Sequence, residues 1–434
     1  MLRSKETLLH GVLSLADQVL VSGSSFVTIA LISQSCSAFH VGEFALAWTI
    51  VALIRTVQER AIAAPYLAFT YRPEFSRPSY RGSVVSHQMF FALSCGLIGL
   101  AICLLLLLTG IERGVLSLSI SLACAAPFIL IRDQMRAVCT ADSKFAKLLI
   151  IDICIVATQL TGILLLFFLG RITLARINGI LGIACMFPIA YWFLQSRSSF
   201  AFEWKSIASD WRHNWRYSRW LVVARMFGIA PFFLIPWFVA LSLGLEKAGA
   251  FGNCMNLVGL SQMFIMGVNN MFQPKTVREL QTSGTKGMFG CIRLTLITIL
   301  PVLLLVSIAF FFLGDFALGL IYGKFYADYG WIAFLMSVST LAMTCSVIYG
   351  NGLAALGASK EYFRGEFLGS VVSILFALLL VPRIGLQGAP MALVLGGLAA
   401  SITTWGSLKK RAQLYDEEIL NANFASNRVQ KLAV

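Results

Sequence analysis

Charged residues are scarce in this sequence of 434 residues: they make up 12% of the chain, against 58% hydrophobic residues. That shortage, with a mean hydropathy of +0.81, excludes the two or three soluble domains that length alone would predict. Apolar runs of about 20 residues recur along the chain, and that length matches the hydrocarbon core of a bilayer. The sequence therefore predicts an all-α, polytopic membrane protein.

Motifs for catalysis or metal binding are also missing. The 10 cysteines form no CxxC pair, the four histidines are isolated, and neither an HExxH motif nor a GxxxxGK[ST] phosphate loop occurs. Cysteine metal sites commonly show closely spaced pairs, and almost all of these cysteines fall within the apolar runs, so we interpret them as small apolar residues of the spans. A polysaccharide polymerase would usually have a large outer loop, and a glycosyltransferase an outer DxD motif; the sequence has neither. We predict no enzyme activity, no cofactor and no metal site.

The apolar runs predict about twelve transmembrane helices. Their ranges are 14–35, 41–62, 86–108, 114–134, 147–169, 174–195, 219–242, 249–272, 292–313, 329–351, 362–382 and 386–407.

Loop charge predicts the orientation of these spans. With the N-terminus inside, only six basic residues fall on the outer side, and the bias toward the inner side is more than fourfold. These six are Arg113, Arg171, Arg176, Lys247, Lys324 and Arg383. Lysine and arginine concentrate in cytoplasmic loops, so both termini are predicted to be cytoplasmic in the inner (plasma) membrane. The net charge of +14 then reflects topology and contact with anionic lipid, not nucleic acid.

The long inner connection divides the chain in half. Residues 202–220 read FEWKSIASDWRHNWRYSRW, with tryptophans on one helical face and arginines beside them, a pattern typical of a helix in the headgroup region. We predict an N-lobe at 1–200 with spans one to six, an interfacial linker helix at 201–219, a C-lobe at 220–408 with spans seven to twelve, and a cytoplasmic tail at 409–434.

The two halves share a pattern. Gly42, Phe44 and Pro65 in the first half correspond to Gly249, Phe251 and Pro274 in the second, at an offset of 207–209 residues. Six spans in each half give the repeats the same orientation. We therefore expect two parallel six-helix lobes with a cavity between them.

Polar residues interrupt the first span. Gln18, Ser22 and Ser25 fall on one helical face, with Asp17 beside them. A carboxylate near the bilayer centre costs at least about 2.5–3.5 kcal/mol. This part of the span must therefore face protein or water.

The sequence resembles the polysaccharide flippases (O-antigen and exopolysaccharide) of the multidrug/oligosaccharidyl-lipid/polysaccharide (MOP) exporter superfamily. The stretches LADQVLVSGSSF, GEFALAW, GAFGNCMNLVG, LGLIYGKFYADYG and the region 350–396 carry the resemblance, in matching order and spacing. The resemblance implies two six-helix bundles forming a V around a central cavity, which opens alternately to each side. It also implies translocation of an isoprenoid-diphosphate-linked oligosaccharide during surface polysaccharide biosynthesis.

That cargo needs a hydrated cavity, because each unpaired hydroxyl costs roughly 2–7 kcal/mol in an apolar medium. Arginine forms charge-assisted, often bidentate hydrogen bonds to phosphate oxygens. We therefore expect Arg55 and Arg225 to hold the diphosphate. The other cavity candidates are Asp17, Gln18, Ser22, Ser25, Asp152, Gln159, Asn256 and Asn270.

Structural roles are the alternative for these residues. Arg225 lies close to the inner membrane edge, where arginine side chains snorkel to the headgroups. Arg55 could pair with Asp17 or Asp152. Asn256 and Asn270 belong to a stripe of glycine, amide and methionine residues that could join helices.

A second function stays open: a cation-coupled small-molecule (multidrug-type) exporter of the same superfamily. Asp17 and Asp152 could serve H⁺ or Na⁺, whereas buried arginines repel cationic cargo. The predicted partners are the lipid-linked oligosaccharide and membrane lipids, with the polysaccharide polymerase and export machinery as further candidates.

Overall fold

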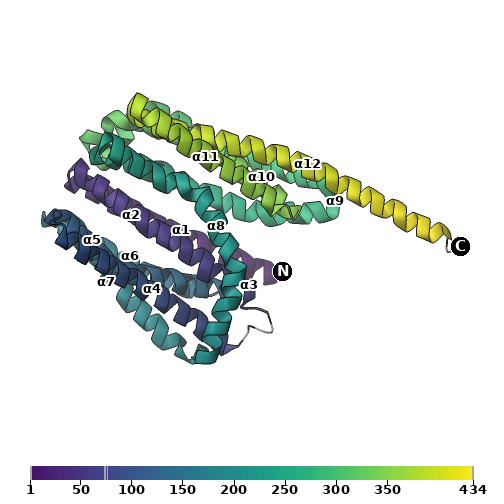
Figure 1. Ribbon diagram of the computed structural model, residues 1–434, viewed down its shortest axis with the longest axis horizontal. Helices are drawn as coiled ribbons and strands as arrows, with labels where there is room; N and C mark the ends of the chain where they lie inside the picture. The colour runs from purple at the N-terminus through teal and green to yellow at the C-terminus, as the bar shows by residue number, and fades with distance from the viewer. Residues whose placement is uncertain (1, 73–74, 76, 433–434) are drawn as a thin grey trace. The chain divides into compact units, whose positions relative to one another are not determined.

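The computed structural model describes residues 2–72, 75 and 77–432, with side chains described for 11–72, 75 and 77–418 (Figure 1). Every regular element of this described part is helical. The elements are α1 Leu2–Ser35, α2 Ala38–Gln58, η1 Glu59–Ala63 (a π-helix), α3 Ala64–Phe69, α4 Pro78–Leu108, α5 Arg113–Ala141, α6 Phe145–Phe168, α7 Leu174–Ser196, η3 Arg197–Ser199, α8 Trp204–Leu243, α9 Leu245–Tyr322, η4 Lys324–Tyr329, α10 Gly330–Ala355, α11 Ser359–Ile384, η5 Gly385–Gln387 and α12 Gly388–Leu432.

Ten helical stretches among the described residues are long and apolar enough to cross a membrane, and the chain is a multi-pass membrane protein. The longest, α9, contains two of the predicted spans. It bends at Gly284, whose φ of 66° lies in the left-handed region. The stretch 359–418 likewise contains two predicted spans, α11 and the first part of α12. Ten stretches therefore accommodate the twelve predicted spans.

The chain divides into two compact units. The first unit comprises Met1–Met226, Gly244–Asn253 and Ile321–Gly323, and the second comprises Phe227–Leu243, Cys254–Leu320 and Lys324–Val434. The predicted lobe boundaries and the V-shaped arrangement stay predictions. The predicted tail, 409–434, extends beyond the last residue whose side chain is described.

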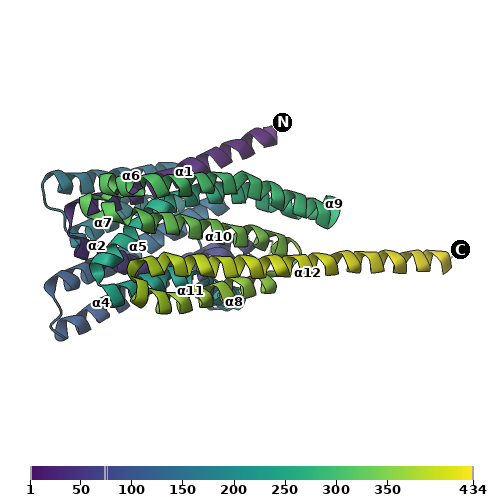
Figure 2. The same ribbon diagram turned by 90° about the horizontal axis from the view of Figure 1, so that it is seen from above.

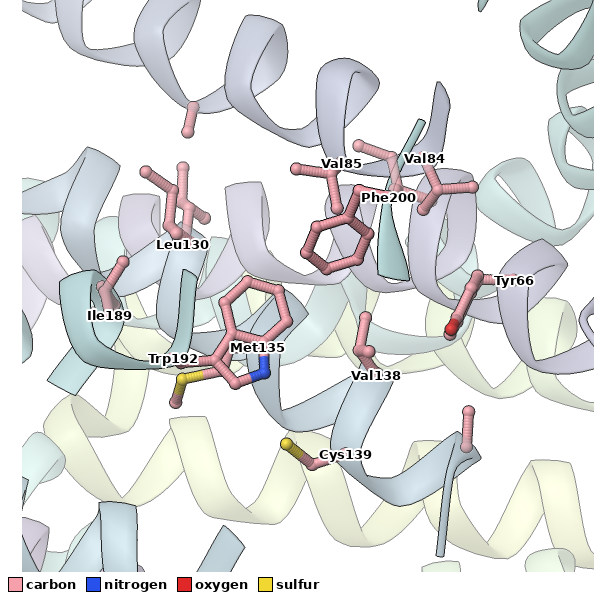
Figure 3. Close-up of a cluster of buried hydrophobic side chains, with 14 of the residues drawn as sticks. Tyr66, Val84, Val85, Leu130, Met135, Val138, Cys139, Ile189, Trp192 and Phe200 are labelled. Atoms are coloured by element: carbon pink, nitrogen blue, oxygen red, sulfur yellow. The ribbon is translucent and has the colours of Figure 1, made fainter. Parts of the chain in front are cut away.

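Two apolar clusters hold the first unit together. In the unit α1 packs against α6, and α5 packs against α4 and α7. The larger cluster joins α3, α4, α5 and α7 through side chains such as Tyr66, Val84, Leu130 and Trp192 (Figure 3). Outward-facing leucines of α4 are exposed, with Leu108 at 77%. In water such a surface would be unfavourable, so we assign it to lipid.

The repeated glycines lie at a close helix crossing within the first unit. A Cβ atom on Gly42 would lie 2.0 Å from the carbonyl oxygen of Leu245, and one on Gly249 would lie 2.7 Å from that of Ala38. The two contacts correspond to each other through the repeat offset of 207 residues: Gly42 corresponds to Gly249, and Ala38 corresponds to Leu245. The repeated glycines Gly42 and Gly249 thus meet at this crossing within the first unit.

Replacing Gly42 with leucine should destabilise the protein by about 3 kcal/mol, because a backbone carbonyl occupies the space that the side chain needs. Thermal unfolding of the purified protein in detergent measures this loss. Gly23→Leu is the matched control, since nothing lies within 4 Å of its Cβ position. Equal stability of the two variants would contradict the close crossing.

The connection at 202–220 is helical, but it does not form a separate element. It continues into the seventh predicted span as the single helix α8. Asp210, Asn214 and Ser218 form its buried face. Asp210 Oδ1 accepts a hydrogen bond from Arg77 Nη2 at 2.7 Å, and Ser218 Oγ donates to the carbonyl of Ala61 in the π-helix. The tryptophans of the segment are exposed, as a lipid-facing helix requires.

The second unit is built on α12, which packs against α10 and α11. A Cβ on Gly369 would lie 2.7 Å from the carbonyl oxygen of Gly396, so α11 and α12 approach each other closely. Met288, Ile299, Ile348 and other apolar residues fill the core between α9, α10 and α12. Figure 2 shows α12 running past the ends of α10 and α11.

Candidate functional site

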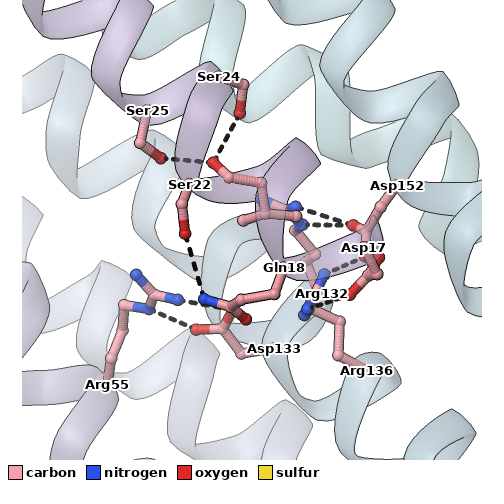
Figure 4. Close-up of polar contacts among 11 residues, drawn as sticks. Asp17, Gln18, Ser22, Ser24, Ser25, Arg55, Arg132, Asp133, Arg136 and Asp152 are labelled. Carbon is pink, nitrogen blue, oxygen red and sulfur yellow. Dashed lines mark hydrogen bonds and ion pairs between the residues drawn. The ribbon is translucent and has the colours of Figure 1, made fainter. Parts of the chain in front are cut away.

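A charge cluster lies inside the first unit, where α1, α5 and α6 meet (Figure 4). Asp152 on α6 is fully buried and pairs with two arginines of α5. Arg132 Nη2 donates to Asp152 Oδ1 at 2.8 Å, and Arg136 Nη1 donates to Asp152 Oδ2. Arg136 Nη2 also donates to Asp17 Oδ2 of α1 at 2.6 Å. The four side chains alternate in charge, and their formal charges cancel.

Burial explains this balance. Asp17 is 3% exposed and Asp152 is 0% exposed, and an unpaired charge at such a site costs several kcal/mol. Arg136 neutralises part of both aspartates, so it is the central member of the cluster. Asp17 Oδ1 is buried and has no hydrogen-bond partner among the described residues.

Arg55 forms a second, more open ion pair. Its Nε and Nη2 atoms donate to the two carboxylate oxygens of Asp133 at 2.5 and 3.0 Å. The Arg55 side chain is 45% exposed and that of Asp133 is 19% exposed. The alternative pairing of Arg55 with Asp17 or Asp152 does not occur in the structure. Arg55 pairs with Asp133 of α5, whereas Arg132 and Arg136 of α5 pair with the other two aspartates. Nearly half of the Arg55 side chain stays exposed.

The polar residues of α1 divide between two faces. Asp17, Ser24 and Thr28 are buried, and Gln159 of α6 donates from Nε2 to Thr28 Oγ1 at 2.9 Å. Gln159 therefore lies in the contact between α1 and α6. The face predicted to line the cavity, with Gln18, Ser22 and Ser25, is less buried. Gln18 Nε2 donates to Ser22 Oγ at 3.1 Å, and Ser25 is exposed.

Arg225 is exposed at the end of the first unit, and it forms no ion pair with a described residue. It follows Asn214 and Ser218 on the same face of α8 by helical spacing. Asn256 and Asn270 belong to the second unit; Asn256 is half-buried and Asn270 is exposed. The neighbouring Asn269 accepts a hydrogen bond from Asn351 Nδ2 at 2.7 Å. The structure thus brings Asp17 and Asp152 together within the first unit.

Arg132, Asp133 and Arg136 were not among the predicted site residues. They lie around the predicted inner end of the fourth span (114–134), whereas α5 continues to Ala141. Their signal was the spacing of Arg132 and Arg136, which fall one helical turn apart on the same face. Two arginines on one face need carboxylates opposite them, and Asp17 and Asp152 were the candidates. Among the described residues, no group of three or more histidine, cysteine or acidic side chains could hold a metal ion.

Comparison with known proteins identifies the fold. No protein-family model and no curated protein sequence matches the chain. Solved structures do match over almost all of its length. A MATE mutant has a TM-score of 0.69 at 12% identity, covering 95% of this chain and 97% of its own. An inward-facing multidrug resistance MATE transporter of the MOP superfamily has a TM-score of 0.69 at 14% identity, covering 94% and 96%.

A third match is a MOP superfamily transporter from Pyrococcus furiosus, with a TM-score of 0.67 at 11% identity over 94% of this chain and 96% of its own. It is described as having a binding pocket of reversed polarity that suggests a different function. The predicted all-α transporter fold is thus confirmed as similar to that of MATE transporters of the MOP superfamily. The resemblance to the polysaccharide flippases stays a prediction.

Proposed function

We propose that the protein is a membrane transporter that exposes one binding site alternately to the two sides of the inner membrane, with both termini cytoplasmic. The fold supports this proposal, because similar structures include MATE transporters described in inward-facing and outward-facing conformations. The charge cluster of the first unit supplies polar groups at membrane depth. Such groups are costly in lipid, and they mark substrate or ion pathways in membrane proteins.

The cargo that the charges favour is an isoprenoid-diphosphate-linked oligosaccharide. The observation that carries this choice is the pairing of every aspartate in the cluster region, Asp17, Asp133 and Asp152, with an arginine. A cationic drug would find no unpaired carboxylate group there. A diphosphate would find the open edge of Arg55 and the exposed Arg225, both suited to bidentate hydrogen bonds with phosphate oxygens.

Small-molecule export is the second candidate, and the neighbours favour it. Two of the similar structures are multidrug resistance transporters. Asp17 also suits cation coupling, because its buried Oδ1 atom lacks a hydrogen-bond partner among the described residues. Under this proposal H⁺ or Na⁺ would bind at Asp17 and weaken its pair with Arg136. The same coupling could drive transport of the saccharide.

Deletion of the gene in its source cell distinguishes between the two proposed cargoes. A flippase for surface polysaccharide biosynthesis predicts that a lipid-linked oligosaccharide accumulates on the cytoplasmic side and that surface glycan is lost. An exporter predicts normal surface glycan and greater sensitivity to cationic drugs. Mass spectrometry of extracted lipids and growth on a drug panel measure both results, and a plasmid copy of the gene is the control. A deletion strain with neither change would contradict the transport proposal.

A further inference from the structure

The second unit contains a groove that the proposed transport site does not use. It has a volume of about 550 Å³ and lies between α9, beyond its bend at Gly284, and α12. Phe289, Ile292 and Leu296 form one wall, at helical spacing along α9. Trp405 and Ala412 belong to the other wall, on α12. The two helix faces thus line a mainly apolar slot.

The walls are held in place by aromatic contacts. The ring of Phe289 meets that of Trp405 edge-on, with centroids 5.9 Å apart. Tyr349 of α10 lies against the same indole at 4.9 Å. Trp405 is therefore fixed between two neighbours rather than free to close the slot. A preformed apolar slot of this kind can hold a hydrocarbon chain at little cost in side-chain order.

Two cations line the same groove. Arg293 on α9 and Lys409 on α12 are exposed, and neither forms an ion pair with a described residue. Lys409 Nζ lies 4.8 Å from the centroid of the Trp405 ring, so the cation borders the apolar wall. The carboxylate in the lining, Asp416, accepts from Thr285 Oγ1 at 2.8 and 3.0 Å. The groove carries a formal charge of +1.

The predicted spans place both cations near the same membrane edge. Arg293 is the second residue of the ninth predicted span, and Lys409 lies two residues after the end of the twelfth, so both fall near the predicted cytoplasmic edge of the hydrocarbon core. Basic pockets between membrane helices on that side suit anionic headgroups. An apolar slot with cations at headgroup level matches one molecule: an anionic phospholipid of the inner leaflet.

We propose that the groove between α9 and α12 is a binding site for one anionic phospholipid, with the phosphate at Arg293 and Lys409 and an acyl chain along Leu296 and Trp405. The site is separate from the charge cluster of the first unit. It does not depend on which cargo the protein carries. A lipid seated there would join the two helices at the membrane edge and stabilise the second unit.

Native mass spectrometry of the full-length protein tests the site. The purified protein is titrated with phosphatidylglycerol or, separately, phosphatidylcholine, and retained lipid is counted. We expect the double variant R293Q/K409Q to bind phosphatidylglycerol about thirtyfold more weakly, since each basic residue at a membrane surface contributes about fivefold in affinity. Lys410→Gln is the matched control, because Lys410 is exposed beside Lys409 and does not line the groove.

Three results would overturn the proposal. Equal retention of phosphatidylglycerol by R293Q/K409Q and K410Q would place the lipid elsewhere. Equal retention of phosphatidylcholine and phosphatidylglycerol by the unchanged protein would remove the role of the cations. Displacement of the lipid by millimolar inorganic phosphate would identify a site for free anions. Thermal unfolding in lipid-free detergent should be the same for both variants, which separates lost binding from lost folding.

Discussion

Replacing Arg136 with glutamine is expected to destabilise the protein by about 3–5 kcal/mol, the cost of breaking a buried ion pair. Among the residues whose side chains are described, the substitution leaves Asp17 without an ion-pair partner and leaves Asp152 with Arg132 alone. Both aspartates are buried. Purified R136Q should unfold at a much lower temperature in detergent, or should not be recovered as a monodisperse protein.

A second variant distinguishes the effect of the unpaired Asp17 charge from the effect of the changed side-chain shape at position 136. In D17N/R136Q the neutral asparagine needs no cation, and Asp152 keeps its pair with Arg132. This double variant should therefore regain most of the stability that R136Q loses. Arg197→Gln is the matched control, because Arg197 is exposed and forms no ion pair with a described residue. If R136Q were as stable as R197Q, the cluster would not hold α1, α5 and α6 together.

Removing the ion pair of Arg55 should affect transport far more than folding. The variant R55Q/D133N takes away both charges, so it leaves no unpaired charge behind. Hydrogen bonds to charged groups contribute about 1.5–3 kcal/mol. If Arg55 binds the diphosphate, transport of the lipid-linked oligosaccharide should fall about 10- to 100-fold. The measurement is the appearance of the labelled oligosaccharide on the outer side of proteoliposomes.

Arg55→Lys separates positive charge from the planar fork of arginine. Lysine keeps the charge but cannot form the bidentate contact, so R55K should show an intermediate loss. Arg225→Gln provides the comparison for the second candidate arginine, and thermal unfolding checks that each variant is folded. Wild-type transport of the lipid-linked oligosaccharide by R55Q/D133N would assign the pair a purely structural role and would contradict the binding of the diphosphate by Arg55.

The sequence by itself determined the membrane helices, because hydropathy along about 20 residues is a local property. Each predicted span lies in helical residues, and even the crossing at Gly42 and Gly249 was marked by a repeated pattern. A local pattern also showed that Asp17 and Asp152 could not face lipid. It did not show where α5 ends, because Arg132, Asp133 and Arg136 at the end of an apolar run look like ordinary loop charges.

Only the tertiary structure decided which charges meet. The rotation of each helix about its axis is set by packing against its neighbours, and a turn of about 100° per residue separates one face from the next. Arg132 and Asp133 are adjacent in the chain, yet Arg132 pairs with Asp152 on α6 and Asp133 pairs with Arg55 on α2. Burial then requires each aspartate to find a cation, and the nearest one in space was not the nearest in the sequence.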